Sequence, residues 1–218
     1  MTQVNSNLWK IKLPIMLFIL LLNSSAYAFG LGDLVGGGGD KGPDLTGTQT
    51  DLTGTLKQAL INLSKSQALM AKAMGLDEQA ILAEKNAEGL KSGDLGAKDD
   101  IEKSIETAAS VQDAIAKKSA EKTVLDAESK VVFVSSIPFY IKGGIGAGMT
   151  AKKAVDAGKS LASAGPMALL KVGPLVTIVA EMPGLITKLS SATGQIMDFM
   201  TANDIPTDKM ENMTKEAF

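Results

Sequence analysis

The chain has 218 residues, of which 45% are hydrophobic and 21% charged, and it contains no cysteine, histidine or arginine. These absences exclude disulfide bonds, imidazole ligands or bases, and the guanidinium fork that binds phosphate through two hydrogen bonds. The 22 lysines are scattered among 24 acidic residues, which argues against nucleic-acid binding because that function needs a concentrated basic face.

The first 28 residues have the organisation of a secretory signal peptide. Lysines at positions 10 and 12 precede a continuous apolar run, residues 15–22, and the small-x-small sequence A-Y-A occupies positions 26–28. The run is shorter than the ~20 residues that a membrane-spanning helix needs. We therefore expect an exported protein that is periplasmic or secreted, with peripheral attachment to a membrane as a further option.

Residues 29–50 are rich in glycine, aspartate and threonine, and this composition predicts a flexible leader. From Asp51 onward the chain has helical periodicity. Two seven-residue series mark one face of the first predicted helix: Leu56, Leu63 and Met70, and Leu60, Gln67 and Met74. Gly75 is expected to end this helix in the left-handed conformation.

Two further helices are predicted before residue 130. The second covers residues 78–91 and carries an apolar stripe of Ala80, Ala83, Ala87 and Leu90. The third begins near residues 95–100 with a stripe of Ile101, Ile105, Ala108 and Ile115. A second stripe is offset near residues 117–118, which predicts a twist or break there, and it comprises Ala120, Val124, Ala127, Val131 and Val134.

The second half of the chain is more apolar, chiefly in residues 131–149 and 160–187. We expect Pro138 to break the first of these segments, and the glycines at 143, 144 and 146 to turn it. Prolines at 166, 174 and 183 are expected to open short helices or to kink a longer one. A last amphipathic helix would bury Leu185, Leu189, Ile196 and Met200, and a polar tail would follow at 204–218.

These patterns predict an all-α protein. The bundle domain is expected at residues 51–203, with amphipathic N-terminal helices and an apolar C-terminal half that glycine and proline interrupt. The apolar helices would form the interior of this bundle, because a helix that is apolar on all sides is normally surrounded by other helices.

Sequence motifs for chemistry are incomplete. Ser119 and Lys122 match S-x-x-K but lie in a Lys/Glu-rich helix without a partner motif. Acidic residues at 99, 100, 102 and 106 are typical of a solvated helix start, and lysines are interleaved with them. The glycines at 143–148 resemble a phosphate loop, but Met149 occupies the position of its lysine. We therefore predict no catalytic, cofactor-binding or metal-binding residues, no nucleotide, and no enzymatic activity.

The most specific functional hypothesis is binding through the apolar half. The expected partner is a lipid, a membrane surface or another envelope protein, and self-association is a further option. The candidate contact residues are Phe133, Phe139, Tyr140, Lys142, Gly144, Gly148, Lys152 and Lys153. A rival hypothesis is a pore-forming or membrane-perturbing protein that inserts residues 131–187 as a helical hairpin. A hydrolase without a recognisable motif is the third.

Overall fold

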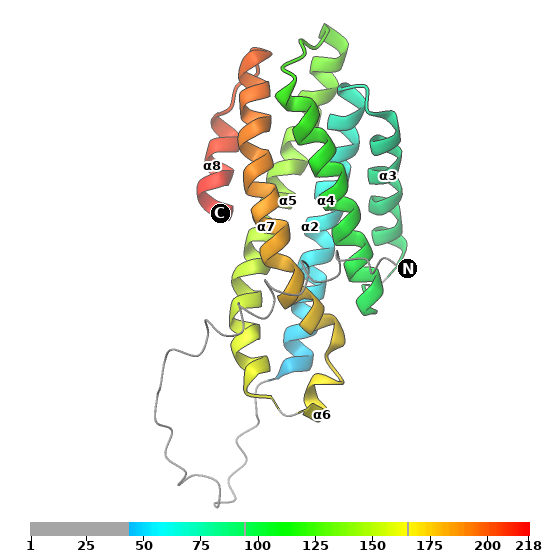
Figure 1. The fold of residues 1–218 in the computed structure, drawn as a ribbon, viewed down its shortest axis with the longest axis vertical. Helices are drawn as coiled ribbons and strands as arrows, with labels where there is room; N and C mark the ends of the chain where they lie inside the picture. Colours follow the sequence, from blue (N-terminus) through cyan, green and yellow to red (C-terminus); the bar gives the residue numbers. More distant parts are fainter. Residues whose placement is uncertain (1–43, 94, 165) are drawn as a thin grey trace, which may run out of the picture. The chain divides into compact units, whose positions relative to one another are not determined.

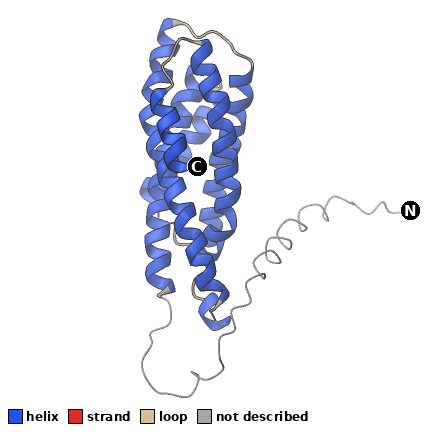
Figure 2. Ribbon diagram, turned by 90° about the vertical axis from the view of Figure 1, so that its left-hand side faces the viewer, coloured by secondary structure: helices blue, strands red, loops and turns tan. Residues whose placement is uncertain are grey.

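Seven helices and no strand make up the part of the chain that the structure, a computed structural model, describes: residues 44–93, 95–164 and 166–218 (Figure 1). The helices are α2 (Leu45–Ala73), α3 (Asp77–Ser92), α4 (Lys98–Ala120), α5 (Ala127–Ala162), α6 (Pro166–Leu169), α7 (Gly173–Ala202) and α8 (Asp208–Ala217). They lie side by side, which confirms the predicted all-α bundle with an apolar C-terminal half (Figure 2). The predicted signal peptide and residues 29–43 of the leader lie outside the described residues.

Successive long helices run in opposite directions, and α2 contacts α3, α4, α5 and α7 (Figure 1). One end of the bundle, here named the loop end, carries residues 74–76, 121–126 and 203–207. There the buried Asn203 side chain accepts a hydrogen bond from the Leu125 amide (2.7 Å) and donates one to the Thr123 carbonyl (3.2 Å). The other end carries the start of α2 and the turn between α5 and α7. Residues 166–172 of this turn are named the hairpin tip.

The first helix begins earlier than predicted. Residues 45–50, which we assigned to the flexible leader, belong to α2, so the leader boundary at residue 50 is wrong. Asp44 caps the helix by accepting a hydrogen bond from the Gly47 amide (2.8 Å), and Leu45 is buried. Capping and burial together outweigh the low helix propensity of the threonines and the glycine in this first turn.

Most predicted stripes of the N-terminal helices are confirmed. The two seven-residue series of α2, the four stripe residues of α3 and the isoleucine stripe of α4 are all buried. Gly75 has a φ of 71°, as expected for a glycine that ends a helix.

The stripe predicted through Val124, Val131 and Val134 is wrong, because all three side chains are exposed. Helix α4 ends at Ala120, and Lys122 has a φ of 50°. The chain therefore re-enters a helix with a new rotation, and α5 buries Phe133, Ser136, Ile137 and Tyr140 instead. A periodic pattern cannot be extended across a loop that resets the helical phase.

Helix α5 is continuous over 36 residues, so the predicted break at Pro138 and the predicted glycine turn are wrong. Pro138 lies on the exposed face with Val134, where water can satisfy the carbonyl that loses its helical partner. The glycines allow close helix contacts: a Cβ atom at Gly143 would lie 2.6 Å from Leu63 Cγ of α2. The absence of a side chain therefore serves packing here rather than a turn.

The predictions for the prolines of the last helices are confirmed in part. Pro166 begins α6, and Pro174 lies in the first turn of α7, but Pro183 lies within an uninterrupted α7. The four apolar residues predicted for the inner face of α7 are all buried.

The predicted polar tail at 204–218 is wrong, because residues 208–217 form α8. Met210, Met213 and Ala217 are spaced on one face of this helix and are buried. The described bundle therefore extends from residue 44 to residue 218 rather than from 51 to 203. Despite the polar composition of α8, three well-spaced residues suffice to pack it against α5.

Candidate functional site

Two of the candidate contact residues lie in the core. Phe133 and Tyr140 have no exposed surface. The Phe133 ring packs against Phe199 of α7 with centroids 5.4 Å apart, and the Tyr140 hydroxyl lies 3.0 Å from that of Thr193. Since Thr193 donates its own proton to the Leu189 carbonyl, Tyr140 is the donor of this pair. Both aromatic residues stabilise the α5–α7 contact and are inaccessible to a partner in this conformation.

The glycines at 144 and 148 are covered by α8. A Cβ atom at Gly144 would lie 2.6 Å from the Met213 sulfur, and one at Gly148 would overlap the Ala217 carbonyl oxygen. This G-x-x-x-G pattern, which also permits close packing in membranes, is therefore used within the bundle by an amphipathic helix.

Two of the candidate contact residues, Phe139 and Lys142, lie at the surface of α5. Neither side chain forms a hydrogen bond or an ion pair with another described helix. Phe139 is half-buried, and the Lys65 ammonium lies 5.6 Å from its ring centroid, a cation–π distance. Lys142 is exposed on the rim of a shallow groove between α2 and α5.

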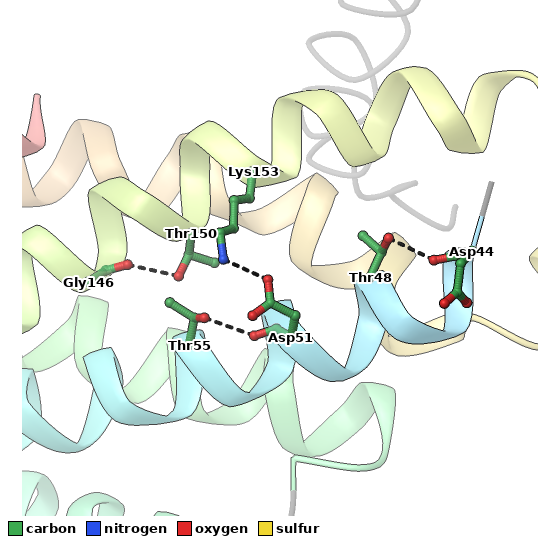
Figure 3. A network of polar contacts seen from close by, with 7 residues as sticks. All are labelled: Asp44, Thr48, Asp51, Thr55, Gly146, Thr150 and Lys153. Atoms are coloured by element: carbon green, nitrogen blue, oxygen red, sulfur yellow. Dashed lines mark hydrogen bonds and ion pairs between the residues drawn. The ribbon is translucent and has the colours of Figure 1, made fainter.

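This groove is lined by Thr50, Asp51, Gly54, Thr55, Gln58, Ala59, Asn62, Lys142 and Gly146. Six of these nine residues have polar side chains. Figure 3 shows the Lys153 ammonium of α5 paired with the carboxylate of one of them, Asp51 of α2 (2.6 Å). The threonines in the same view donate to carbonyls of their own helix, as Thr55 does to Asp51 and Thr150 to Gly146. An exposed ion pair therefore links α2 and α5 beside the groove.

Lys152 and Lys153, which we expected to meet anionic groups of a partner, both bond within the chain. Lys152 donates to the Glu216 carbonyl of α8 (3.0 Å), and Lys153 pairs with Asp51. Both side chains remain exposed, so their bonds are of the weak surface type.

Ser119, Tyr140 and Asp126 each have a structural role. Ser119 is buried and donates to the Ile115 carbonyl, so its S-x-x-K match is not arranged for proton transfer to Lys122. No group of three or more carboxylates among the described residues lies close enough to hold a metal ion. Burial raises the pKa of Tyr140 well above its usual range, and the Ser129 amide lowers the pKa of the Asp126 carboxyl that caps α5. These shifts follow from a core position and a helix cap.

The most exposed apolar side chains of the C-terminal half lie at the hairpin tip, which the sequence analysis assigned to the bundle interior. Met167 and Leu170 are 71% and 79% exposed. The sequence signal that could have revealed this exposure is the prolines and glycines around these residues, which indicate a turn. Such a turn at the end of a long hairpin has few neighbours that could cover its side chains.

Helices α5 and α7 are each long and apolar enough to cross a membrane, a property that core helices share. Their apolar stretches are staggered, however, because Tyr140 lies opposite Thr193 in the antiparallel pair. In this register the centre of residues 131–149 and the centre of residues 173–187 are separated by about 20 Å along the hairpin, at 1.5 Å per residue. A hydrocarbon core of ~30 Å cannot hold both stretches at once without a large shift of one helix.

No protein-family model, curated protein or solved structure matches this chain.

Proposed function

We propose that this chain is an exported, non-enzymatic binding protein of the cell envelope that acts through its apolar C-terminal half. The main supporting observation is that the bundle covers this half incompletely. In the most apolar 18-residue windows of α5 and α7, only 44% and 39% of the residues are buried. Val131 and Val134 of α5 and Val176 of α7 are exposed, so these helices have apolar surface available to a partner.

The expected partner is a lipid, a membrane surface or an envelope protein, with self-association as a further option. The charge distribution supports an anionic rather than a cationic partner for this half, since residues 130–203 contain 7 lysines and 3 acids. Residues 29–129 contain 17 acids and 11 lysines, so the net charge of the preceding half has the opposite sign.

The test is fractionation of the producing cells. The protein is expected in an envelope fraction, from which high salt or mild detergent releases it, and N-terminal sequencing should place the first residue near 29. Purified protein should also sediment with isolated envelopes. A protein that stays wholly in the cytosol, or that never sediments with envelopes, would contradict the proposal.

Pore formation is the alternative that the two long apolar helices favour. The stagger of about 20 Å means that α5 and α7 must slide past one another before both could span a bilayer. Release of a trapped dye from vesicles distinguishes the two functions: binding without release supports the binding protein, and rapid release supports the pore.

A further inference from the structure

The hairpin tip combines large exposed apolar side chains with lysines. Met167 and Leu170 are 71% and 79% exposed, and the neighbouring Val176 of α7 is 42% exposed. Residues 157–180 contain Lys159 and Lys171 and no acidic residue, and Asp156 and Glu181 border this segment. Apolar side chains within a basic segment are typical of surfaces that lie at the boundary between lipid headgroups and acyl chains.

The ion pairs at this end leave one lysine available. Lys159 pairs with Asp156 at 2.8 Å, whereas Lys171 is exposed and forms no ion pair with any residue that the structure describes. Lys171 directly follows Leu170, so a surface that accepts the leucine also receives the ammonium group.

The loop end provides a contrast. Val124 is 75% exposed there, and Val131 in the second turn of α5 is 70% exposed. Residues 117–131 mix three acids with four lysines, and Glu121 pairs with Lys118. Asp126 and Glu128 closely follow Val124, so an anionic surface that received this valine would also meet these two carboxylates. Exposed apolar area alone therefore does not distinguish the two ends, but the acidic residues next to Val124 do, because Leu170 has a lysine as its neighbour.

We propose that the hairpin tip is a docking site for an anionic lipid bilayer. Met167 and Leu170 enter the interface between headgroups and acyl chains, and Lys171 contacts anionic headgroups. This inference rests on the proposed function and names the lipid surface as its partner. A second copy of the chain is a poorer occupant, because tip-to-tip contact would bring two unpaired Lys171 side chains together.

Charged residues next to the tip limit how deeply the hairpin can insert into a bilayer. Lys152, Lys153, Asp156 and Lys159 lie on the last turns of α5, which directly precede the tip. Burial of these groups in hydrocarbon is costly, so the tip docks in one leaflet and the hairpin does not span the bilayer.

The experiment uses the absence of cysteine in the chain. Leu170→Cys and Val124→Cys each provide a unique site for an environment-sensitive dye, at opposite ends of the bundle and at similar exposure. The two labelled proteins are mixed with vesicles of phosphatidylcholine alone or of phosphatidylcholine with roughly one-third phosphatidylglycerol. The label at position 170 should move to shorter emission wavelength with the anionic vesicles, and the label at position 124 should not.

Unlabelled variants then measure the contribution of each group. Met167→Asp with Leu170→Asp should weaken partition into anionic vesicles more than about tenfold, whereas Val124→Asp with Val131→Asp, the matched control, should lower it much less. Lys171→Gln should weaken it about fivefold. Circular dichroism should show unchanged helix content for all three variants, because every altered side chain is exposed.

Four results would overturn the docking site. Equal responses of the two labels, or full binding by the tip double variant, would show that another surface meets the lipid, and the proposed binding function would stand. If the wild-type protein binds no vesicle but sediments with envelopes, the tip is not a lipid site and the partner is a protein. If neither assay shows binding, the proposed function fails with it.

Discussion

Residues 131–149, here named the middle of α5, and the hairpin tip have similar compositions but different environments. Both contain apolar residues and a proline; the middle of α5 also contains glycines, and Gly165 and Gly173 flank the tip. The middle of α5 lies among α2, α7 and α8, so Phe133 and Tyr140 are fully buried, whereas Leu170 at the tip is 79% exposed. The difference shows that the number of neighbouring helices, rather than apolarity, decides which segment is core and which is surface.

The largest effect is expected in the middle of α5. Phe133→Ala should lower the free energy of unfolding by about 3–5 kcal/mol, because it removes a fully buried ring that packs against Phe199. Val131→Ala, two residues earlier on the exposed face, should change it by less than about 0.5 kcal/mol. Chemical denaturation monitored by circular dichroism measures both. Equal losses of unfolding free energy in the two variants would contradict the assignment of Phe133 to a buried face of α5 and of Val131 to an exposed one.

A moderate effect is expected where α8 covers α5. Gly148→Ala should destabilise the protein by about 1–3 kcal/mol, because the new methyl group overlaps the Ala217 carbonyl. Amide hydrogen exchange in residues 208–217 should rise with it. The control is Gly54→Ala in α2, where a Cβ atom has no neighbour within 4 Å, and it should stabilise by about 0.5–1 kcal/mol. Stabilisation by both substitutions would contradict the tight contact.

A smaller, pH-dependent effect is expected at Tyr140. Tyr140→Phe loses the hydrogen bond to Thr193, and this should cost about 1 kcal/mol near neutral pH. Burial raises the pKa of Tyr140 in the folded state. The stability associated with its protonated form is therefore complete below the unfolded pKa of about 10 and declines as the pH rises above it.

The free energy of unfolding of the wild type should consequently fall toward that of Tyr140→Phe between about pH 9 and 11. Urea denaturation at several pH values measures both proteins under the same conditions, so that lysine titration affects them alike. A gap that stays constant over this range would mean that the Tyr140 hydroxyl is accessible to solvent.

The smallest effect is expected at the tip. Leu170→Ser should leave the free energy of unfolding within about 0.5 kcal/mol of the wild type, because the side chain has few contacts to lose. Thermal unfolding is the measurement. A clear destabilisation would place Leu170 in a packed environment and would remove the contrast between the tip and the middle of α5.

The stripes of the first three helices could be predicted because each lies within one uninterrupted helix. The same method failed for Val124 and Val131, since the loop after α4 resets the rotation of the chain. It also failed for the start of α2 and for α8, whose compositions are polar, because Asp44 caps the first and three apolar contacts hold the second.

The candidate contact residues show the same limit. Aromatic and glycine residues of α5 were recognised as important, but whether they face a partner or the bundle depends on helices distant in sequence. Gly143 meets α2, and Gly148 meets α8, which begins 60 residues later. A single sequence contains no signal for such pairings, whereas charge patterns such as that of residues 157–180 are local and remain readable.

By itself, the sequence determined that the chain is helical, that most of the amphipathic faces turn inward, and that its chemistry cannot use histidine, cysteine or arginine. These properties depend on residue type and on spacing within one helix. The tertiary structure decided that Pro138 and the glycines lie in a continuous helix, that α8 covers part of it, and that the hairpin tip is left exposed. Those outcomes depend on which helices lie side by side, and burial energies between distant segments set that arrangement.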